Sequence, residues 1–444
     1  MRKYIIPVGL LSVLLLFLSE SCSLFQGRDE VIIGTEKTDT CRSNPEHTYE
    51  VYIPDIRNRC SEMPVLIIID PHGNGKYALE LFKAGADQHE FALFASNLLR
   101  NNYTEYIDGL NDLIEDIKGK YPVADKIYLA GFSGGGRMIL NYARYFPAEG
   151  LIVSGALASA EELTAVKSPV FAIIGMDDFN FIEVAQYIFK PEAAPQNLRI
   201  EFTQASHSWP KPSLLSDALG YLELSVIKGS KCSEMKAQQK EYCHRQAERV
   251  DSLSGKDEYL MAGLIARNMI FCDEFSRHFD FHSLHERIEY SSAFNAELEQ
   301  LKESIRFELT VRHAYYDALQ SEDTLWWRNE INSLEAKISS ERDLYRNMAY
   351  RRIKGFLGIM CYSLSNQIMQ EKGAGSLVNI LSIYKMLEPE NPDMFYFSAL
   401  VARQKGDIKK ARSILQQAHQ AGFNDLKRMT KEVPELVDFY NHLE

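Results

Sequence analysis

The 444-residue sequence predicts an α/β domain with a mostly parallel sheet, followed by an all-helical domain. Between about residues 45 and 228, short β-rich apolar runs alternate with segments of helical periodicity. Continuous apolar strands separated by helices are typical of a parallel sheet covered on both faces. After about residue 230 these runs stop, and apolar residues recur at helical spacing with few Pro or Gly. We therefore expect the α/β domain at 45–228 and the helical domain at 231–444, joined at Lys228-Gly229-Ser230.

The chain is acidic, with a formal net charge of -12 at pH 7. This charge argues against a nucleic-acid partner and against attachment to a membrane by charge alone, because both need a basic surface. It is otherwise ordinary for a soluble surface and indicates no substrate.

The first residues have the organisation of an export signal. A basic pair precedes an apolar run at 4–18, which is too short to span a bilayer. The stretch SESC, ending at Cys22, resembles a bacterial lipobox of the looser Bacteroidetes kind, although Ser19 stands where Leu is usual. The resemblance implies a signal peptide at 1–21, a lipid on Cys22, a tether and first strand at 22–44, and anchoring in the bacterial cell envelope. An ordinary secretory signal cleaved near Cys22 is the alternative.

Export makes disulfides possible, and the chain has seven cysteines. Cys41 and Cys60 bracket the first strand of the α/β domain and are a candidate pair. Cys232 and Cys243 would lie about 16 Å apart in one helix, too far for a bridge. No C-x-x-C pair is present, so a zinc knuckle is not expected. The cysteines predicted to be buried helical thiols are Cys272 and Cys361.

Seven apolar runs within the α/β domain are predicted strands. They lie at 48–54, 64–70, 90–96, 126–132, 150–156, 168–175 and 198–204. Helical segments separate most of them, and the clearest is 103–122.

The fourth of these strands runs into Gly131-Phe132-Ser133-Gly134-Gly135, before a predicted helix at 137–145. A serine between glycines at a strand-to-helix turn is either incidental or a nucleophile on a strained elbow. Glycines suit the second reading, because larger neighbours would clash at so sharp a turn. A serine hydroxyl is a weak nucleophile alone, so a base and an orienting acid must follow downstream.

Both partners follow later strands, in the order Ser, Asp, His. The strand at 168–175 ends just before Asp177 and Asp178, and the strand at 198–204 just before His207. We expect His207 to take the Ser133 proton and Asp178 to orient the imidazole. Asp178 stands three residues past the strand-end glycine, and Asp177 is the alternative acid.

An oxyanion hole is expected from two backbone amides. The strand at 64–70 is followed by His72-Gly73-Asn74. We expect the amides of Gly134 and of one loop residue, Asn74 or its neighbour Gly73, to bind the oxyanion. His72 itself is interpreted as a loop residue that packs under the site.

On these residues, 45–228 resembles the α/β-hydrolase superfamily, in the branch of lid-less serine esterases that includes polyhydroxyalkanoate depolymerases and feruloyl esterases. The elbow, Arg137 and the His-x-Trp-Pro stretch at 207–210 carry the resemblance. It implies a serine esterase that needs no cofactor or metal and cleaves small-molecule or polymer-borne esters. A serine peptidase on the same triad and a non-catalytic interaction scaffold are the alternatives. Only about a dozen residues separate the fifth and sixth strands, where lipases often carry a cap. We therefore expect an uncapped site, unless the helical domain covers it.

The helical domain contains a stretch that resembles a tetratricopeptide repeat. Residues 392–422 place small and apolar side chains at the packing positions of that repeat, with a weaker unit before them, so the repeat region is 376–422. The residues that match are Phe395, Ala399, Ala402, Gly406, Ala411, Leu415 and Ala418, with Leu377, Leu381 and Tyr384 in the weaker unit. The whole chain resembles Bacteroidetes lipoproteins that join such domains, and the repeats imply a protein partner. A generic helical hairpin is the alternative.

Three weaker signals have ordinary explanations. His278, His282 and His285 share a spacing that can bind zinc, but a plain helix is favoured and no metal site is predicted. Trp326 and Trp327 are expected in core or interdomain packing. His89 is expected to be a capping or surface residue at a helix end.

Overall fold

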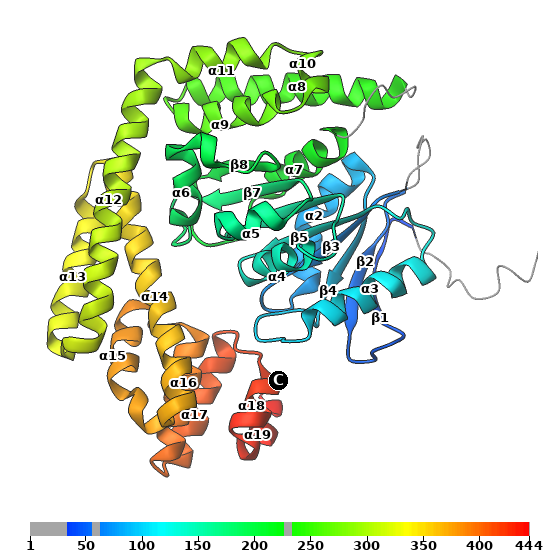
Figure 1. Ribbon diagram of the computed structural model, residues 1–444. Coiled ribbons are helices and arrows are strands. Elements are labelled where there is room, and N and C mark those ends of the chain that lie inside the picture. Colours follow the sequence, from blue (N-terminus) through cyan, green and yellow to red (C-terminus); the bar gives the residue numbers. More distant parts are fainter. Residues whose placement is uncertain (1–32, 56–62, 226–232, 444) are drawn as a thin grey trace, which may run out of the picture.

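The computed structural model describes residues 33–55, 63–225 and 233–443. An α/β domain is followed by a helical region that runs along one side of the sheet and then bends beneath it (Figure 1). The predicted signal peptide, Cys22 and the predicted linker lie outside the described residues. Within the described part of the chain, no helix is both long and apolar enough to cross a membrane.

An eight-stranded sheet in the order β1-β2-β4-β3-β5-β6-β7-β8 forms the centre of the α/β domain. The strands β3 to β8 are parallel, whereas β1 and β2 pair antiparallel at one edge. The bounds are β1 Glu36–Thr40, β2 Thr48–Tyr52, β3 Val65–Ile69, β4 Ala92–Ser96, β5 Ile127–Phe132, β6 Gly150–Ser154, β7 Val170–Gly175 and β8 Leu198–Thr203. All seven predicted strands are present, and β1 lies in the segment predicted to hold a first strand. The prediction of a mostly parallel sheet is confirmed.

Helices cover both faces of this sheet, as its continuous apolar strands require. They are α2 Gly75–His89, α3 Tyr106–Lys120, α4 Gly134–Ala143, α5 Ala160–Ala165, α6 Ile182–Phe189, the 3₁₀ turn η2 Pro191–Ala193, and α7 Pro212–Ser225. Helices α3, α4 and α6 bury apolar residues against one face, and α2 and α7 cover the other. The carboxyl ends of the parallel strands therefore share one edge, where the loops between strands and helices gather.

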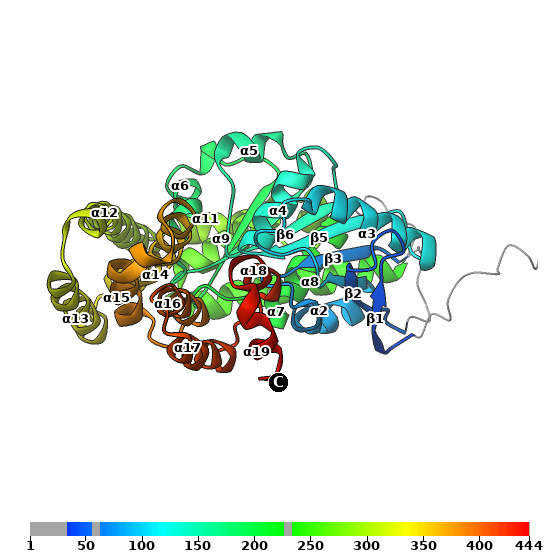
Figure 2. The ribbon, with the colours of Figure 1, turned by 90° about the horizontal axis from the view of Figure 1, so that it is seen from below.

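All other described elements are helical, which confirms the predicted change to an all-helical region. They are α8 Ser233–Ser254, α9 Tyr259–Ile270, α10 Asp273–Ser276, α11 Phe281–Glu289, α12 Ser292–Ser321, α13 Thr324–Ser340, α14 Leu344–Lys372, η3 Ala374–Leu377, α15 Val378–Leu387, α16 Pro392–Gln404, α17 Ile408–Gln420, α18 Leu426–Glu432, η4 Pro434–Leu436 and α19 Val437–Asn441. In the view from below, α18 lies across the end of the sheet (Figure 2).

The helical region and the α/β domain share their apolar cores. Leu260 and Leu264 of α9, and Leu301 and Ile305 of α12, belong to the same buried cluster as the strands. On α9, the Asn268 carboxamide also pairs with the backbone of the edge strand β8, donating to the Ile200 carbonyl at 2.9 Å. These contacts cover an edge that would otherwise expose unpaired backbone groups.

The predicted repeat is a helical hairpin of α16 and α17. Ala411, Leu415 and Ala418 are buried, as the repeat pattern requires, whereas Phe395 is only partly buried. In the weaker unit, Leu377 lies in the short turn η3, before α15. The hairpin is therefore present, and its identification with a tetratricopeptide repeat stays a prediction.

The cysteines of the described segments are buried free thiols. Cys41 Sγ lies 3.6 Å from the Asp112 carbonyl oxygen, and its candidate partner Cys60 lies outside the described residues. Cys361 is within α14 as expected, but Cys272 precedes α10 rather than lying in a helix. The candidate bridge between Cys41 and Cys60 therefore stays a prediction.

The expectation of a surface position for His89 is wrong. This residue ends α2 but is buried, with Nδ1 3.7 Å from Glu223 Oε2, because α7 packs over it. Burial lowers the pKa of His89 to about 4. Trp327, by contrast, is fully buried against Tyr315, which confirms a core position.

The three histidines with zinc-like spacing do not share one helix. Helix α11 begins at Phe281, so His278 precedes it. His285 pairs instead with Glu289, at 3.6 Å. Among the residues that the structure describes, no group of three His, Cys, Asp or Glu side chains is placed to hold a metal ion.

Candidate active site

Ser133 stands between β5 and α4 with φ 50° and ψ -117°, a conformation that residues with a Cβ seldom adopt. A side chain at Gly131 would have its Cβ 2.5 Å from the Gly135 carbonyl oxygen, so the turn can close only with glycine there. The Ser133 amide donates to the Ser154 carbonyl at 2.8 Å, which fixes the elbow to the next strand. The sequence therefore builds a sharp turn that raises the serine hydroxyl above the sheet edge.

His207 and Asp178 complete a hydrogen-bonded chain from this serine. His207 Nε2 lies 2.9 Å from Ser133 Oγ, and His207 Nδ1 lies 2.9 Å from both carboxylate oxygens of Asp178. A carboxylate can only accept, so Nδ1 carries a proton and Nε2 accepts from the serine hydroxyl. The three predicted residues follow different strands, and the fold brings them together.

Asp178, and not Asp177, is the carboxylate beside the histidine. Asp178 is 1% exposed, and its Oδ1 also accepts the Asn180 amide at 2.8 Å. Asp177 turns away and forms an ion pair with Arg351 of α14, at 2.9 Å. The carboxylate of the alternative acid, Asp177, is therefore paired with an arginine of the helical region rather than with His207.

Aromatic rings surround the imidazole of His207. The rings of Phe179 and Phe132 lie with centroids 4.3 and 4.7 Å from the imidazole centroid. Two residues beyond the histidine, Trp209 Nε1 donates to Asp70 Oδ2 at 2.9 Å, which ties the histidine loop to the end of β3. These contacts restrict the ring position and keep bulk water from part of its surface.

The loop amides predicted for the oxyanion hole are engaged within their own loop. The Gly73 amide donates to the Asp70 carbonyl at 3.0 Å, and the Asn74 amide to Asp70 Oδ1 at 3.3 Å. The Gly134 amide begins α4, where helix amides have no intrahelical acceptor. The Asn101 carboxamide lies against Gly134, where a Cβ would overlap it. The oxyanion roles of Gly134, Asn74 and Gly73 stay predictions.

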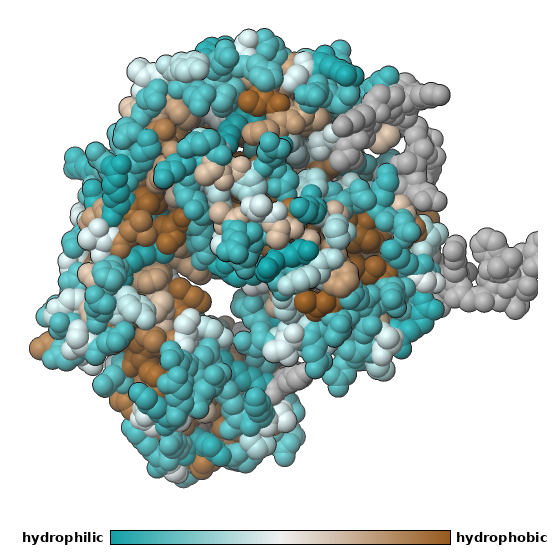
Figure 3. All heavy atoms as spheres, viewed as in Figure 1, coloured by the Kyte–Doolittle hydropathy of each residue, from teal (hydrophilic) through white to brown (hydrophobic). Residues whose placement is uncertain are grey.

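A cavity of about 1300 Å³ opens above Ser133 between the two parts of the chain. Figure 3 shows the hollow between the α/β domain and the lower helices. From the α/β side the cavity is lined by the triad serine and histidine and by His72, which faces the cavity rather than packing under the site. The helical region therefore covers the site, which is the alternative that the sequence left open to an uncapped site. The helical residues that line it include Arg351, Lys354, Tyr362, Tyr384, Glu388, Asn391, Asp393 and Arg428.

Most charged side chains on the cavity wall are paired. Lys354 lies 2.5 Å from Glu335, Arg428 lies 3.4 Å from Asp393, and Arg100 reaches Asp425 across the two domains at 3.7 Å. These pairs leave little net charge on the wall.

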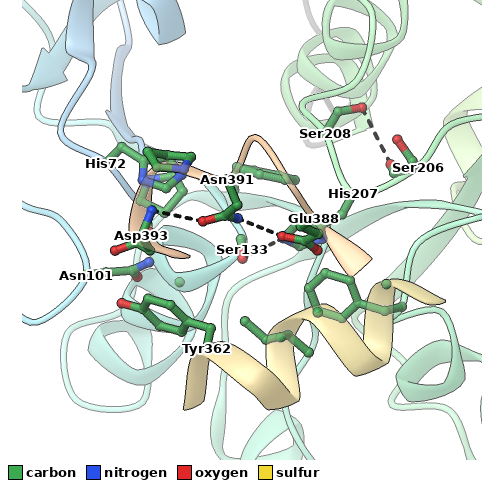
Figure 4. Close-up of a pocket in the computed structure, with 18 of the residues that line it drawn as sticks. His72, Asn101, Ser133, Ser206, His207, Ser208, Tyr362, Glu388, Asn391 and Asp393 are labelled. Carbon is green, nitrogen blue, oxygen red and sulfur yellow. Dashed lines mark hydrogen bonds between the residues drawn. The ribbon is translucent and has the colours of Figure 1, made fainter. Parts of the chain in front are cut away.

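The Glu388 carboxylate differs, because its hydrogen-bond partner is the neutral Asn391, at 2.6 Å. Both side chains lie in front of Ser133 in the cavity (Figure 4). Burial raises the pKa of Glu388, and also that of Asp393 beside it.

Sequence reasoning identified the triad but none of the helical residues on the cavity wall. The triad has local signals, because each member follows a strand end in a recognisable motif. Glu388, Asn391 and Arg428 have none, since ordinary helices and loops carry them and only the packing of two domains brings them over Ser133.

The α/β domain therefore has a mostly parallel eight-stranded sheet with a serine on the sharp turn between β5 and α4. No protein-family model matches the sequence, and no curated protein matches it. Solved structures that are similar cover the N-terminal half of the chain. The Staphylococcus aureus fluorophosphonate-binding serine hydrolase F is 11% identical, over 43% of this chain and 97% of that one, with a TM-score of 0.36. An α/β serine hydrolase without a lid from Xanthomonas campestris is 18% identical, over 46% and 100%, with a TM-score of 0.35. Est1E from Butyrivibrio proteoclasticus is 13% identical, over 41% and 95%, with a TM-score of 0.33.

Proposed function

We propose that this protein is a serine hydrolase that cleaves carboxylic esters through Ser133, His207 and Asp178. The observation that carries the proposal is the hydrogen-bonded chain of the three side chains, with 2.9 Å at both links. Strain at Ser133 supports it, since unfavourable backbone conformations persist mainly where they serve a site. An interaction scaffold has no use for such an arrangement.

In this mechanism, Ser133 Oγ attacks the acyl carbonyl while His207 Nε2 takes its proton. The imidazolium that forms is stabilised by the Asp178 carboxylate at Nδ1, and its proton passes to the leaving alcohol. Water then attacks the acyl-enzyme, with His207 again acting as the base, and releases the acid. Every group needed is a side chain or amide of this chain, so the proposal requires no cofactor.

The Gly134 amide, with the Asn74 amide, is proposed to bind the oxyanion. The Asn74 bond to Asp70 is long at 3.3 Å, so this amide is the loop donor that is most easily shared with a substrate oxygen. These two amides are expected to stabilise the transition state more than the bound substrate, because negative charge develops on that oxygen only in the transition state.

The cavity favours a molecule that extends on both sides of the ester bond. Its volume of about 1300 Å³ exceeds the ~300–1,000 Å³ typical of small-ligand sites. Since helices cover it, a small molecule or a chain end fits better than the middle of a polymer.

A peptidase is the second candidate, and Glu388 favours it. Its carboxylate lies in the cavity with a neutral partner, so it is available to bind a substrate ammonium group. Amide cleavage would use the same triad. A panel of p-nitrophenyl esters and of aminoacyl p-nitroanilides, with free and blocked amino groups, separates the two. Turnover of esters alone supports the esterase, and turnover of unblocked anilides that is lost in Glu388→Gln supports the peptidase.

Labelling with a fluorophosphonate probe tests the nucleophile. We expect the protein to be labelled, and Ser133→Ala to lose both labelling and at least ~1000-fold in turnover, because the attacking oxygen is removed. The substitution deletes one hydroxyl, so circular dichroism should show an unchanged fold. A Ser208→Ala variant serves as the control and should keep its labelling. Labelling that persists in Ser133→Ala would exclude this serine.

We further propose that the protein is lipid-anchored at Cys22 in a bacterial cell envelope. The support is the resemblance of the SESC stretch to a lipobox after a short apolar run. We expect Cys22→Ser to move the protein from the membrane pellet to the soluble fraction after cell fractionation. A variant that still pellets with membranes, and is extracted only by detergent, contradicts the anchor. The helical repeats are proposed to bind a protein partner.

A further inference from the structure

Asp178 lies in a short loop, residues 176–181, that leaves the end of β7 and enters α6. Part of this loop holds itself in place, since the Asp178 amide donates to the Gly175 carbonyl at 3.0 Å. The Met176 amide donates to the Thr203 carbonyl at 2.8 Å, and the Asp177 amide to the Ala205 carbonyl at 3.0 Å, both within the α/β domain. The Met176 and Phe179 carbonyls and the Asp177 carboxylate instead contact side chains of α12 and α14 in the helical region.

Three arginines from these helices bind the residues on both sides of Asp178. Arg352 Nη1 donates to the Met176 carbonyl at 2.5 Å, and Arg312 Nη2 donates to the Phe179 carbonyl at 2.8 Å. The third, Arg351, forms the ion pair with Asp177. The triad acid is therefore flanked on both sides by cations that belong to another domain.

Glu308 holds two of these arginines in position. Its Oε2 accepts from Arg352 Nε at 2.7 Å, and its Oε1 lies 2.5 Å from Arg312 Nη2. Both Glu308 and Arg352 are 0% exposed. Charges are buried at a high desolvation cost, so this cluster persists only because each group has several partners.

The same loop controls the histidine. The ring of Phe179, whose carbonyl binds Arg312, lies 4.3 Å from the His207 imidazole, centroid to centroid. Helix α14 approaches this ring so closely that a Cβ at Gly355 would lie 3.3 Å from it. A shift of the loop would therefore move both Asp178 and the ring beside His207.

We infer that Arg312 and Arg352 of the helical region are positioning residues for the triad acid, acting through the Met176 and Phe179 carbonyls. The helical region is then part of the catalytic machinery rather than only a cover. Neither arginine lines the cavity, so their effect is on the triad and not on substrate contact. The inference rests on the proposed hydrolase activity, but the position of Asp178 can be measured without it.

The kinetic test compares Arg312→Met and Arg352→Met with Arg403→Met. Arg403 pairs with Glu435 and lies outside the cavity wall, so its variant is the matched control. We expect the first two variants to lose ~10- to 100-fold in kcat and in the rate of fluorophosphonate labelling, with KM changed less than threefold. Arg312→Lys, which keeps a cationic donor, should recover part of the loss.

A double-mutant cycle shows whether the effect passes through Asp178. In an Asp178→Asn background the histidine has lost its carboxylate, so Arg312→Met should cause no further loss of kcat. The inference is overturned if Arg312→Met lowers kcat by the same factor in the Asp178→Asn background as in the native chain. It is also overturned if folded Arg312→Met keeps the native kcat.

The second readout is the proton between His207 Nδ1 and Asp178, which gives a far-downfield proton NMR resonance. We expect the resonance in the native chain and in Arg403→Met, and its loss or upfield shift in Arg312→Met and Asp178→Asn. Melting curves for each variant define the temperature at which it is folded. If the native chain shows the resonance, and the variants change it as expected, but the native chain has no activity, only the proposed function is contradicted. A resonance unchanged in Arg312→Met, or absent from the native chain, overturns the positioning role.

Discussion

The environment of each histidine decides whether its pKa changes when the chain folds. His47 is fully buried beside the sheet, and its Nε2 pairs with Ser96 Oγ at 2.8 Å. Burial lowers the pKa of His47 to about 4. In the unfolded chain the same side chain titrates near 6.5. Between these two values the unfolded chain binds a proton that the folded protein excludes, so acidification favours unfolding.

We therefore expect the stability of the protein to fall as the pH is lowered from about 7 toward 4. The contribution of His47 is present above its unfolded pKa and is lost as the pH falls through the folded value, at most about 3 kcal/mol. His89, whose pKa is also lowered to about 4, acts in the same direction. Urea unfolding at pH 7, 6 and 5 measures this slope, and His47→Gln should flatten it. His313→Gln, at a largely exposed position, should not. A slope that is equal in all three proteins contradicts the assignment.

At the scale of elements, the elbow between β5 and α4 depends on glycine. An added Cβ at Gly131 would meet the carbonyl group of Gly135 and, at 2.7 Å, the amide nitrogen of Gly136. All these atoms are backbone, so no side-chain rotation relieves the overlap. The strand and the helix would have to separate, and Ser133 would move with them.

We expect Gly131→Ala to destabilise the protein by ~1–3 kcal/mol or more and to reduce fluorophosphonate labelling strongly, because the backbone at the elbow must shift. The free energy of unfolding in urea and the labelling rate are the measurements. Gly255→Ala is the control, since its added Cβ would have its nearest neighbour at 3.4 Å, an ordinary contact. Equal stability of the two variants would show that the elbow tolerates a side chain.

For the whole molecule, the two predicted domains are not independent. Apolar residues of α9, α12 and α14 complete the core of the α/β domain. Arg312 and Arg352 donate hydrogen bonds to the loop that carries Asp178. The α/β domain alone would expose the apolar surface that these helices cover. Large exposed apolar surfaces of this kind promote association.

A chain truncated after residue 228 is therefore expected to aggregate or to melt well below the full-length protein. Size-exclusion chromatography, dye binding to exposed apolar surface and thermal melting measure this. Adding a flexible tag of similar length to the truncated chain controls for size alone. A monomeric truncated chain with the melting temperature of the intact protein would contradict the shared core.

The sequence by itself determined the strand order along the chain, the change to helices after residue 230, and the residues Ser133, Asp178 and His207. These features depend on short-range patterns: strand periodicity, a glycine-lined turn, and residues just past strand ends. Only the tertiary structure decided that the helical region covers the site, that Arg351 forms an ion pair with Asp177, and that Glu388 lies in the cavity. These contacts join residues more than a hundred positions apart on faces without a distinctive local pattern. The positions of these contacting residues are set by the packing of the helical region against the α/β domain, which cannot be predicted from a short stretch of sequence.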